Sequence, residues 1–112
     1  MLHCTDSQNP ILTTNATATV SEFQSVTLTC HHNADKVKWW RGSKSILLIA
    51  FGTPCTLSDP RPDYMNCNCL KPNYTCVIPS LSMSMDKVVW KCSDFINSYS
   101  NEVILNITGK VY

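Results

Sequence analysis

Short segments in which apolar and polar residues alternate dominate this chain, and strict alternation is typical of strands with one buried face. The clearest segment covers residues 22–30, and its last residue, Cys30, occupies one of the alternating apolar positions. Residues 87–93 show the same pattern, and Cys92 again occupies one of the alternating apolar positions. The sequence therefore predicts two strands that each direct a cysteine toward the core.

Five further segments predict strands. They are residues 11–19, which are expected to form a continuous or a broken edge strand, and residues 37–41, 46–51, 74–81 and 102–108. Pro79 interrupts one of them, and its missing N–H predicts a bulge or an edge position there. The proline-rich residues 52–72 predict a loop, and no stretch of ten or more residues has good helical periodicity. The whole pattern predicts an all-β sandwich with turns about every 8–12 residues.

Length and charge limit the classes of protein to consider. A chain of 112 residues predicts a single domain, with a core at residues 20–108 and an N-terminal arm at residues 1–10. The formal net charge of +1 gives no reason to expect binding to nucleic acid or to an anionic membrane surface. No stretch approaches the roughly 18 apolar residues of a membrane-spanning helix, so direct membrane insertion is not expected. The N-terminus lacks the pattern of a signal peptide, and Met1 is interpreted as an initiator added to a mature ectodomain fragment.

Cysteines and glycosylation motifs indicate an oxidising compartment. The chain has seven cysteines, a density that is unusual where thiols stay reduced. N-glycosylation sequons begin at Asn15, Asn73 and Asn106. We therefore expect an extracellular glycoprotein, either secreted or the ectodomain of a membrane protein at the cell surface.

Trp39 lies between Cys30 and Cys92, and this Cys…Trp…Cys spacing resembles that of the immunoglobulin superfamily. The 62 positions from the first cysteine to the second, together with the apolar residues 46–51, favour a variable-type (V-set) domain. The resemblance implies a two-sheet Greek-key sandwich. It also implies that a Cys30–Cys92 disulfide joins the sheets and that Trp39 packs against it.

The resemblance is incomplete at the corner that precedes Cys92. Asp86 lies six residues before that cysteine, as in the family's Asp-x-Gly-x-Tyr-x-Cys element, and the family pattern would pair it with Arg61. Val88 stands where the family usually has glycine or alanine, and Trp90 stands where it has tyrosine. The tyrosine hydroxyl bonds the upstream backbone, whereas an indole N–H can donate one bond from a different position. We therefore expect a divergent corner, and the lack of Gly-x-Gly in the last strand argues against antibody-like pairing.

Five cysteines remain beside the pair that the resemblance implies, so at least one is left over. Cys55 is expected to bond either Cys67 or Cys69, which would constrain the proline-rich segment. Cys76 is expected near the other member of that Cys-Asn-Cys pair, although a bond to Cys4 is also open. We expect Cys4 to be unpaired or to bond outside this chain. Each disulfide would contribute about 2–4 kcal/mol of stability.

Metal-binding and catalytic chemistry have little support in the sequence. His31-His32 and Cys67-Asn68-Cys69 are conceivable zinc ligands, but Cys-x-x-Cys and His-x₃-His spacings do not occur, so no metal or other cofactor is expected. The chain also lacks a Gly-x-Ser-x-Gly motif and a phosphate-binding glycine loop. An enzyme is therefore not expected.

The outward parity of the predicted strands indicates an interaction surface. Lys38 and Trp40 alternate with buried positions on one strand, and Ile104 does so on another. In residues 46–51 the outward set is either Ile46, Leu48 and Ala50, or Leu47, Ile49 and Phe51. The resemblance implies that these strands share one sheet, whose outer side is the GFCC′ face of V-set domains.

An apolar centre at Trp40 and Ile104 would suit binding to another protein. The predicted polar rim consists of Lys38, Arg41, Lys44 and Lys91. The alternative is that a loop at residues 94–101, or the segment after residues 46–51, covers the patch. A glycan at Asn106 would lie on the same face, so that sequon is either unused or at the edge of the patch.

Taken together, these features predict a protein-recognition module. We expect a V-type domain of an immune or adhesion receptor or ligand that binds the ectodomain of a different protein. Two alternatives stay open. Several sequons, extra cysteines and a divergent corner also resemble viral immunoglobulin-like immunomodulatory glycoproteins, and a homophilic adhesion or spacer domain would have the same fold.

Overall fold

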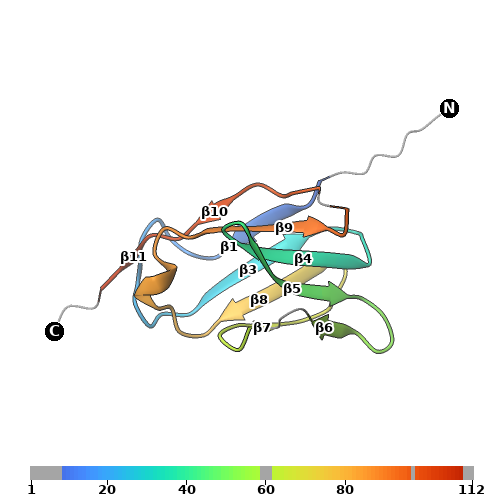
Figure 1. Ribbon diagram of the computed structural model, residues 1–112. Helices are drawn as coiled ribbons and strands as arrows, with labels where there is room; N and C mark the ends of the chain where they lie inside the picture. Colours follow the sequence, from blue (N-terminus) through green and yellow to red (C-terminus); the bar gives the residue numbers. More distant parts are fainter. Residues whose placement is uncertain (1–8, 59–61, 97, 110–112) are drawn as a thin grey trace.

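The computed structural model describes residues 9–58, 62–96 and 98–109, and in this part the chain is built of strands (Figure 1). The strands are β1 (Ile11–Thr14), β2 (Val20–Ser21), β3 (Val26–His31), β4 (Lys36–Arg41), β5 (Lys44–Ala50), β6 (Thr56–Ser58), β7 (Asn66–Cys67), β8 (Asn73–Ile78), β9 (Val89–Asp94), β10 (Val103–Ile104) and β11 (Ile107–Thr108). A short 3₁₀ turn, η1 (Met83–Met85), precedes β9. No helix in these residues is long and apolar enough to cross a membrane. The predicted all-β class is confirmed.

The strands form two main sheets and a small third one. The four-stranded sheet has the order β1-β3-β8-β7, and the five-stranded sheet has the order β10-β9-β4-β5-β6. All pairs within these two sheets are antiparallel. In the third sheet, β11 pairs with β2 in parallel. The edge position that was predicted for the first strand is confirmed, because β1 is the end strand of the four-stranded sheet among the described residues.

A disulfide between Cys30 and Cys92 joins β3 of the four-stranded sheet to β9 of the five-stranded sheet. Both cysteines are completely buried, as is Trp39, whose partner across the β4–β9 pair is Cys92. Alternate residues of the two central strand pairs fill this core, and apolar burial of this kind is the main source of stability. Two sheets joined across a shared core are consistent with a β-sandwich.

Two further disulfides link the segment that was predicted to be a loop. Cys55 bonds Cys69, and Cys67 bonds Cys76. The expectation that Cys55 bonds one member of the Cys-Asn-Cys pair is confirmed, and the open alternative of a bond from Cys4 to Cys76 is excluded, because Cys76 has another partner. Cys4 itself lies outside the described residues.

The predicted loop at residues 52–72 is not wholly irregular, which corrects the sequence prediction. It contains β6, which pairs with β5, and β7, which pairs with β8. Both strands have three residues or fewer. Strands of that length are too short to show a periodic pattern in the sequence, and here disulfides at Cys55 and Cys67 hold the chain beside its neighbours.

Four predicted strands differ clearly from their expected limits. The strand predicted at residues 11–19 ends at Thr14, and the next strand begins only at Val20. The strand predicted at residues 22–30 begins only at Val26, because the preceding residues form a turn in which Phe23 has a φ of 72° and donates its backbone N–H to the Leu81 carbonyl. β8 ends at Ile78, so Pro79 terminates the strand and produces no bulge within it. The strand predicted at residues 102–108 is divided into β10 and β11, because the chain leaves β9 and continues beside β2.

Asp86 and Trp90 contribute differently to the corner before β9. The Asp86 carboxylate accepts a hydrogen bond of 2.7 Å from the backbone N–H of Ile107, and so fixes the start of β11. Arg61, the predicted partner of Asp86, lies outside the described residues. The indole N–H of Trp90 is buried and has no hydrogen-bond partner within the described residues, so this N–H adds no hydrogen bond to the corner.

Candidate interaction surface

Strand pairing places three of the predicted binding residues together on the outer side of the five-stranded sheet. Trp40 on β4 lies directly opposite Lys91 on β9, and Lys38 lies opposite Ser93. Their neighbours Trp39 and Cys92 point into the core. Because successive side chains of a strand alternate between its two faces, these four residues share the outer side. We call this side of the sheet the outer face.

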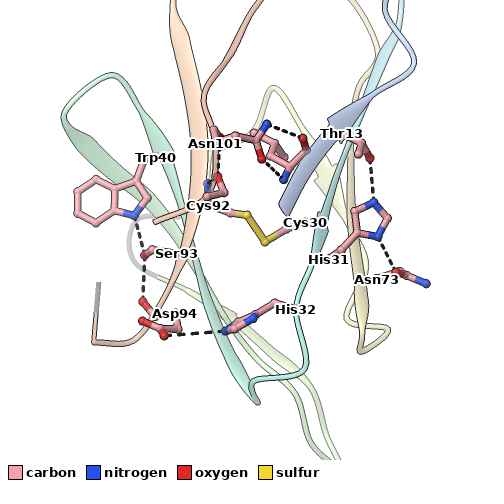
Figure 2. Close-up of a disulfide and its surroundings, with 12 residues drawn as sticks. Thr13, Cys30, His31, His32, Trp40, Asn73, Cys92, Ser93, Asp94 and Asn101 are labelled. Atoms are coloured by element: carbon pink, nitrogen blue, oxygen red, sulfur yellow. Dashed lines mark hydrogen bonds and ion pairs between the residues drawn. A yellow bond between two sulfur atoms is a disulfide. The ribbon is translucent and has the colours of Figure 1, made fainter. Parts of the chain in front are cut away.

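Trp40 is half-buried and held in one orientation. Its indole N–H donates to the Ser93 hydroxyl at 2.9 Å, and that hydroxyl donates to the Asp94 carbonyl at 2.9 Å. The ring of Tyr99 meets the Trp40 ring edge-on, with 5.5 Å between centroids and 66° between planes. Figure 2 shows the Trp40 side chain projecting away from the Cys30–Cys92 disulfide. The tryptophan is thus a fixed part of the outer face.

Lysine ammonium groups alternate with aromatic rings across this face. The Lys91 ammonium lies 4.3 Å from the Tyr99 centroid and 5.9 Å from the Trp40 centroid. The Lys38 ammonium lies 5.9 Å from the Trp40 centroid and 5.2 Å from that of Phe95. A cation within about 6 Å of a ring is attracted by its quadrupole. With Lys36, whose ammonium is 5.0 Å from the Phe95 centroid, these residues form a set that we call the lysine–aromatic row: Lys36, Lys38, Lys91, Phe95, Trp40 and Tyr99.

Asp94 organises the loop that carries two of these rings. Its carboxylate accepts the backbone N–H of Ile96 at 3.0 Å and that of Ser98 at 2.9 Å. The other carboxylate oxygen faces His32, 3.9 Å from its Nε2 (Figure 2). The predicted alternative, in which residues 94–101 cover the patch, holds only at one edge, because Tyr99 packs on Trp40 while the same loop exposes Phe95.

Aliphatic side chains extend the outer face on both sides of the row. Ile104 on β10 lies opposite Val89, with half of its side chain exposed. On β5, Leu48 lies opposite Lys38 and is half-buried. Of the two outward sets considered for residues 46–51, the one with Leu48 and Ala50 faces out. Ile46 departs from this set and is buried, because a register shift beside Trp40 leaves it without a partner on β4.

Arg41 and Lys44 lie away from this face. The Arg41 guanidinium donates to the Ser84 carbonyl at 3.1 Å and lies 5.8 Å from the Trp90 centroid. Lys44 lies opposite Arg41 where β5 begins. Arg41 shares the parity of Trp39, so the alternation itself places it on the other side from Lys38, and the rim predicted at Arg41 and Lys44 does not form there.

Three members of the row were missed by the sequence prediction. Lys36 has the same parity as Lys38 and Trp40, so a strand predicted one residue longer would have included it. Phe95 and Tyr99 lie beyond the regular part of β9, where periodicity gives no information. The hydrogen bonds of Asp94 order the loop between them, and an isolated antiparallel bridge with Ser93 places Tyr99.

The three sequon asparagines are exposed and lie outside the lysine–aromatic row. Asn15 accepts the backbone N–H of Thr27 at 2.8 Å, and Asn73 bonds the His31 ring at 2.9 Å (Figure 2), so both lie beside the four-stranded sheet. Asn106 donates to the Ala18 carbonyl at 3.2 Å, in the segment that leads to β2. Asn106 thus lies beside the segment that precedes β2, and both arrangements predicted for a glycan there stay open.

Within the described residues, no group of three or more His, Cys, Asp or Glu side chains is arranged to hold a metal ion. A comparison of the sequence with models of known protein families finds no match, and a comparison with curated proteins finds no significant relative.

Proposed function

We propose that this chain is a V-type immunoglobulin domain with Greek-key topology. The parallel pairing of β11 with β2 supports this, as do the two strands, β5 and β6, that follow β4 in the five-stranded sheet. V-type domains differ from constant-type domains in having such additional strands beside the third core strand. The buried Cys30–Cys92 disulfide with Trp39 beside it is a further supporting feature.

We also propose an extracellular location for the domain. Three disulfides in a small all-β domain would be unusual in a reducing cytosol. The three sequon asparagines are exposed, as attachment of an N-glycan requires. Secretion of the domain with glycans at these positions would support the proposal.

The function that we propose is recognition of a partner protein through the outer face. The observation that carries it is the lysine–aromatic row with the exposed Ile104 beside it. Fixed aromatic rings with an apolar neighbour and charged groups around them are the usual composition of a protein-binding patch. A different protein is the better occupant than a second copy, because two such faces in contact would bring lysines against lysines.

The experiment compares two matched variants. The purified glycosylated domain is screened against an array of receptor ectodomains, and the affinity for each bound ectodomain is measured by surface plasmon resonance. Ile104→Asp should weaken binding about 10-fold or more, since it places a charge in the contact. Ile11→Asp is the control, because Ile11 has a similar exposed fraction, 58% against 51%, but lies on the four-stranded sheet.

Equal losses in the two variants would contradict binding through the outer face. Trp40→Ala is the less informative variant, because the Trp40 side chain also bonds Ser93 and contacts Tyr99. Its removal would change the structure of the face as well as the contact. Sedimentation velocity at high protein concentration tests the homophilic alternative, which predicts a dimer where our proposal predicts a monomer.

A further inference from the structure

The lysines of the outer face have no carboxylate partners among the described residues. In this part of the chain the observed ion pairs are Lys71 with Asp35, at 2.7 Å, and His32 with Asp94. Neither pair includes a lysine of the lysine–aromatic row. These ammonium groups lie over aromatic rings instead. The outer face is therefore locally positive, although the formal net charge of the whole chain is only +1.

The aromatic rings also restrict where the ammonium groups can be. The Lys38 ammonium lies within 6 Å of the centroids of both Trp40 and Phe95, and the Lys91 ammonium lies within 6 Å of those of both Trp40 and Tyr99. An exposed lysine normally samples many rotamers, and that freedom is lost when it pairs with a charge on a partner. Because the rings already limit the two lysines, less entropy is lost on binding. Two ammonium groups are thus arranged in advance near Trp40, each 5.9 Å from the centroid of its ring.

We propose that the surface recognised by this face is an acidic protein surface, in which carboxylates flank an apolar centre. Aspartate or glutamate side chains of the partner pair with Lys38 and Lys91, while its apolar side chains pack on Trp40 and Ile104. This inference rests on the proposed function and adds the chemistry of the partner. The unpaired lysines supply the charge complementarity that gives such contacts their specificity and fast association.

Other occupants fit these residues less well. A sulfated polysaccharide would match the lysines but would leave Phe95 and Ile104, both about half exposed, without apolar contact. A second copy of the chain would present lysines to lysines. An acidic protein surface with apolar side chains satisfies both the charged and the apolar parts of the face.

The test uses an immobilised random copolymer of glutamate and tyrosine as a probe for an acidic, aromatic polypeptide surface. Polyglutamate and heparin serve as comparison surfaces, and binding is measured by biolayer interferometry. The K38Q/K91Q variant removes the two lysines beside Trp40. The K44Q/K87Q variant is the matched control, because it removes the same charge from two exposed lysines outside the lysine–aromatic row.

We expect the domain to bind the copolymer more tightly than polyglutamate or heparin. K38Q/K91Q should lose about 10-fold in affinity and K44Q/K87Q less than about 2-fold, since close charge pairs outweigh distant ones. Raising the salt concentration from about 50 to about 300 mM should weaken the wild type more than K38Q/K91Q. Equal losses in the two variants, or a preference for heparin, would overturn the inference.

The same variants separate this inference from the proposed function. On an ectodomain found in the array, K38Q/K91Q should weaken binding as Ile104→Asp does. If Ile104→Asp abolishes binding and K38Q/K91Q leaves it unchanged, the outer face binds a partner without acidic complementarity, and only the inference fails. If neither variant changes binding, the proposed use of the outer face fails as well.

Discussion

The hydrogen bond between Trp40 and Ser93 should make a measurable contribution to stability as well as fixing the outer face. Ser93 is completely buried, and its hydroxyl accepts from the Trp40 indole while it donates to the Asp94 carbonyl. Trp40→Phe keeps an aromatic ring and removes the donor. A neutral hydrogen bond contributes about 0.5–1.5 kcal/mol net, so we expect a loss of about 1 kcal/mol in the free energy of unfolding.

A double-mutant cycle measured by urea denaturation isolates this bond. Trp40→Phe and Ser93→Ala each remove it, so the double variant should be about 1 kcal/mol more stable than the sum of the single losses implies. Thr29→Val is the control partner, because Thr29 lies on the four-stranded sheet and bonds Thr75, and its cycle with Trp40→Phe should be additive. A coupling below about 0.3 kcal/mol between Trp40 and Ser93 would refute the reasoning.

Three further predictions concern the scaffold around the face. Replacing Cys55 and Cys69 together by alanine should lower the free energy of unfolding by about 3 kcal/mol, because their separation of 14 residues closes a loop of that size class. Denaturation under non-reducing conditions measures the loss, and an unchanged midpoint would contradict it. Asn101→Ala should lower the free energy of unfolding by about 1–2 kcal/mol, because the Asn101 amide bonds both the backbone N–H and the carbonyl of Leu12 on β1 at 2.9 Å. Asn101→Gln should not restore this stability. Burial, followed by the charge of Asp35, raises the pKa of Tyr74 above 10.0, so the unfolded phenol ionises first and stability should fall as pH rises beyond that value. Tyr74→Phe should remove this part of the alkaline slope, and an unchanged slope in alkaline denaturation curves would contradict the assignment.

The core was predictable from the sequence because alternation and burial are directly linked. Cys30, Trp39 and Cys92 each occupy the inward parity of a strand, and all three are completely buried. The same rule was ambiguous in residues 46–51, where both parities are apolar. The register shift beside Trp40 resolves the ambiguity by burying adjacent residues, and a shift of that kind leaves no periodic trace.

The composition of the outer face was only partly predictable, for a different physical reason. Lys38, Trp40 and Lys91 follow from strand parity. Phe95 and Tyr99 do not, because one lies in a loop ordered by the Asp94 carboxylate and the other forms an isolated antiparallel bridge with Ser93. Asp94 is followed by Phe95 and Ile96, and strand alternation gives no direction for side chains in such a loop.

The contrast between the outer sides of the two main sheets favours one of them as the binding surface. On the four-stranded sheet the polar side chains satisfy one another: His31 bonds both Thr13 and Asn73 at 2.9 Å, and Thr29 bonds Thr75. A glycan at Asn73 would cover part of that side. On the five-stranded sheet the lysines of the row have no carboxylate among the described residues, and apolar side chains stay exposed beside them. A side whose polar groups are already paired gains little from a partner, whereas unpaired charges next to exposed apolar surface gain from both pairing and burial.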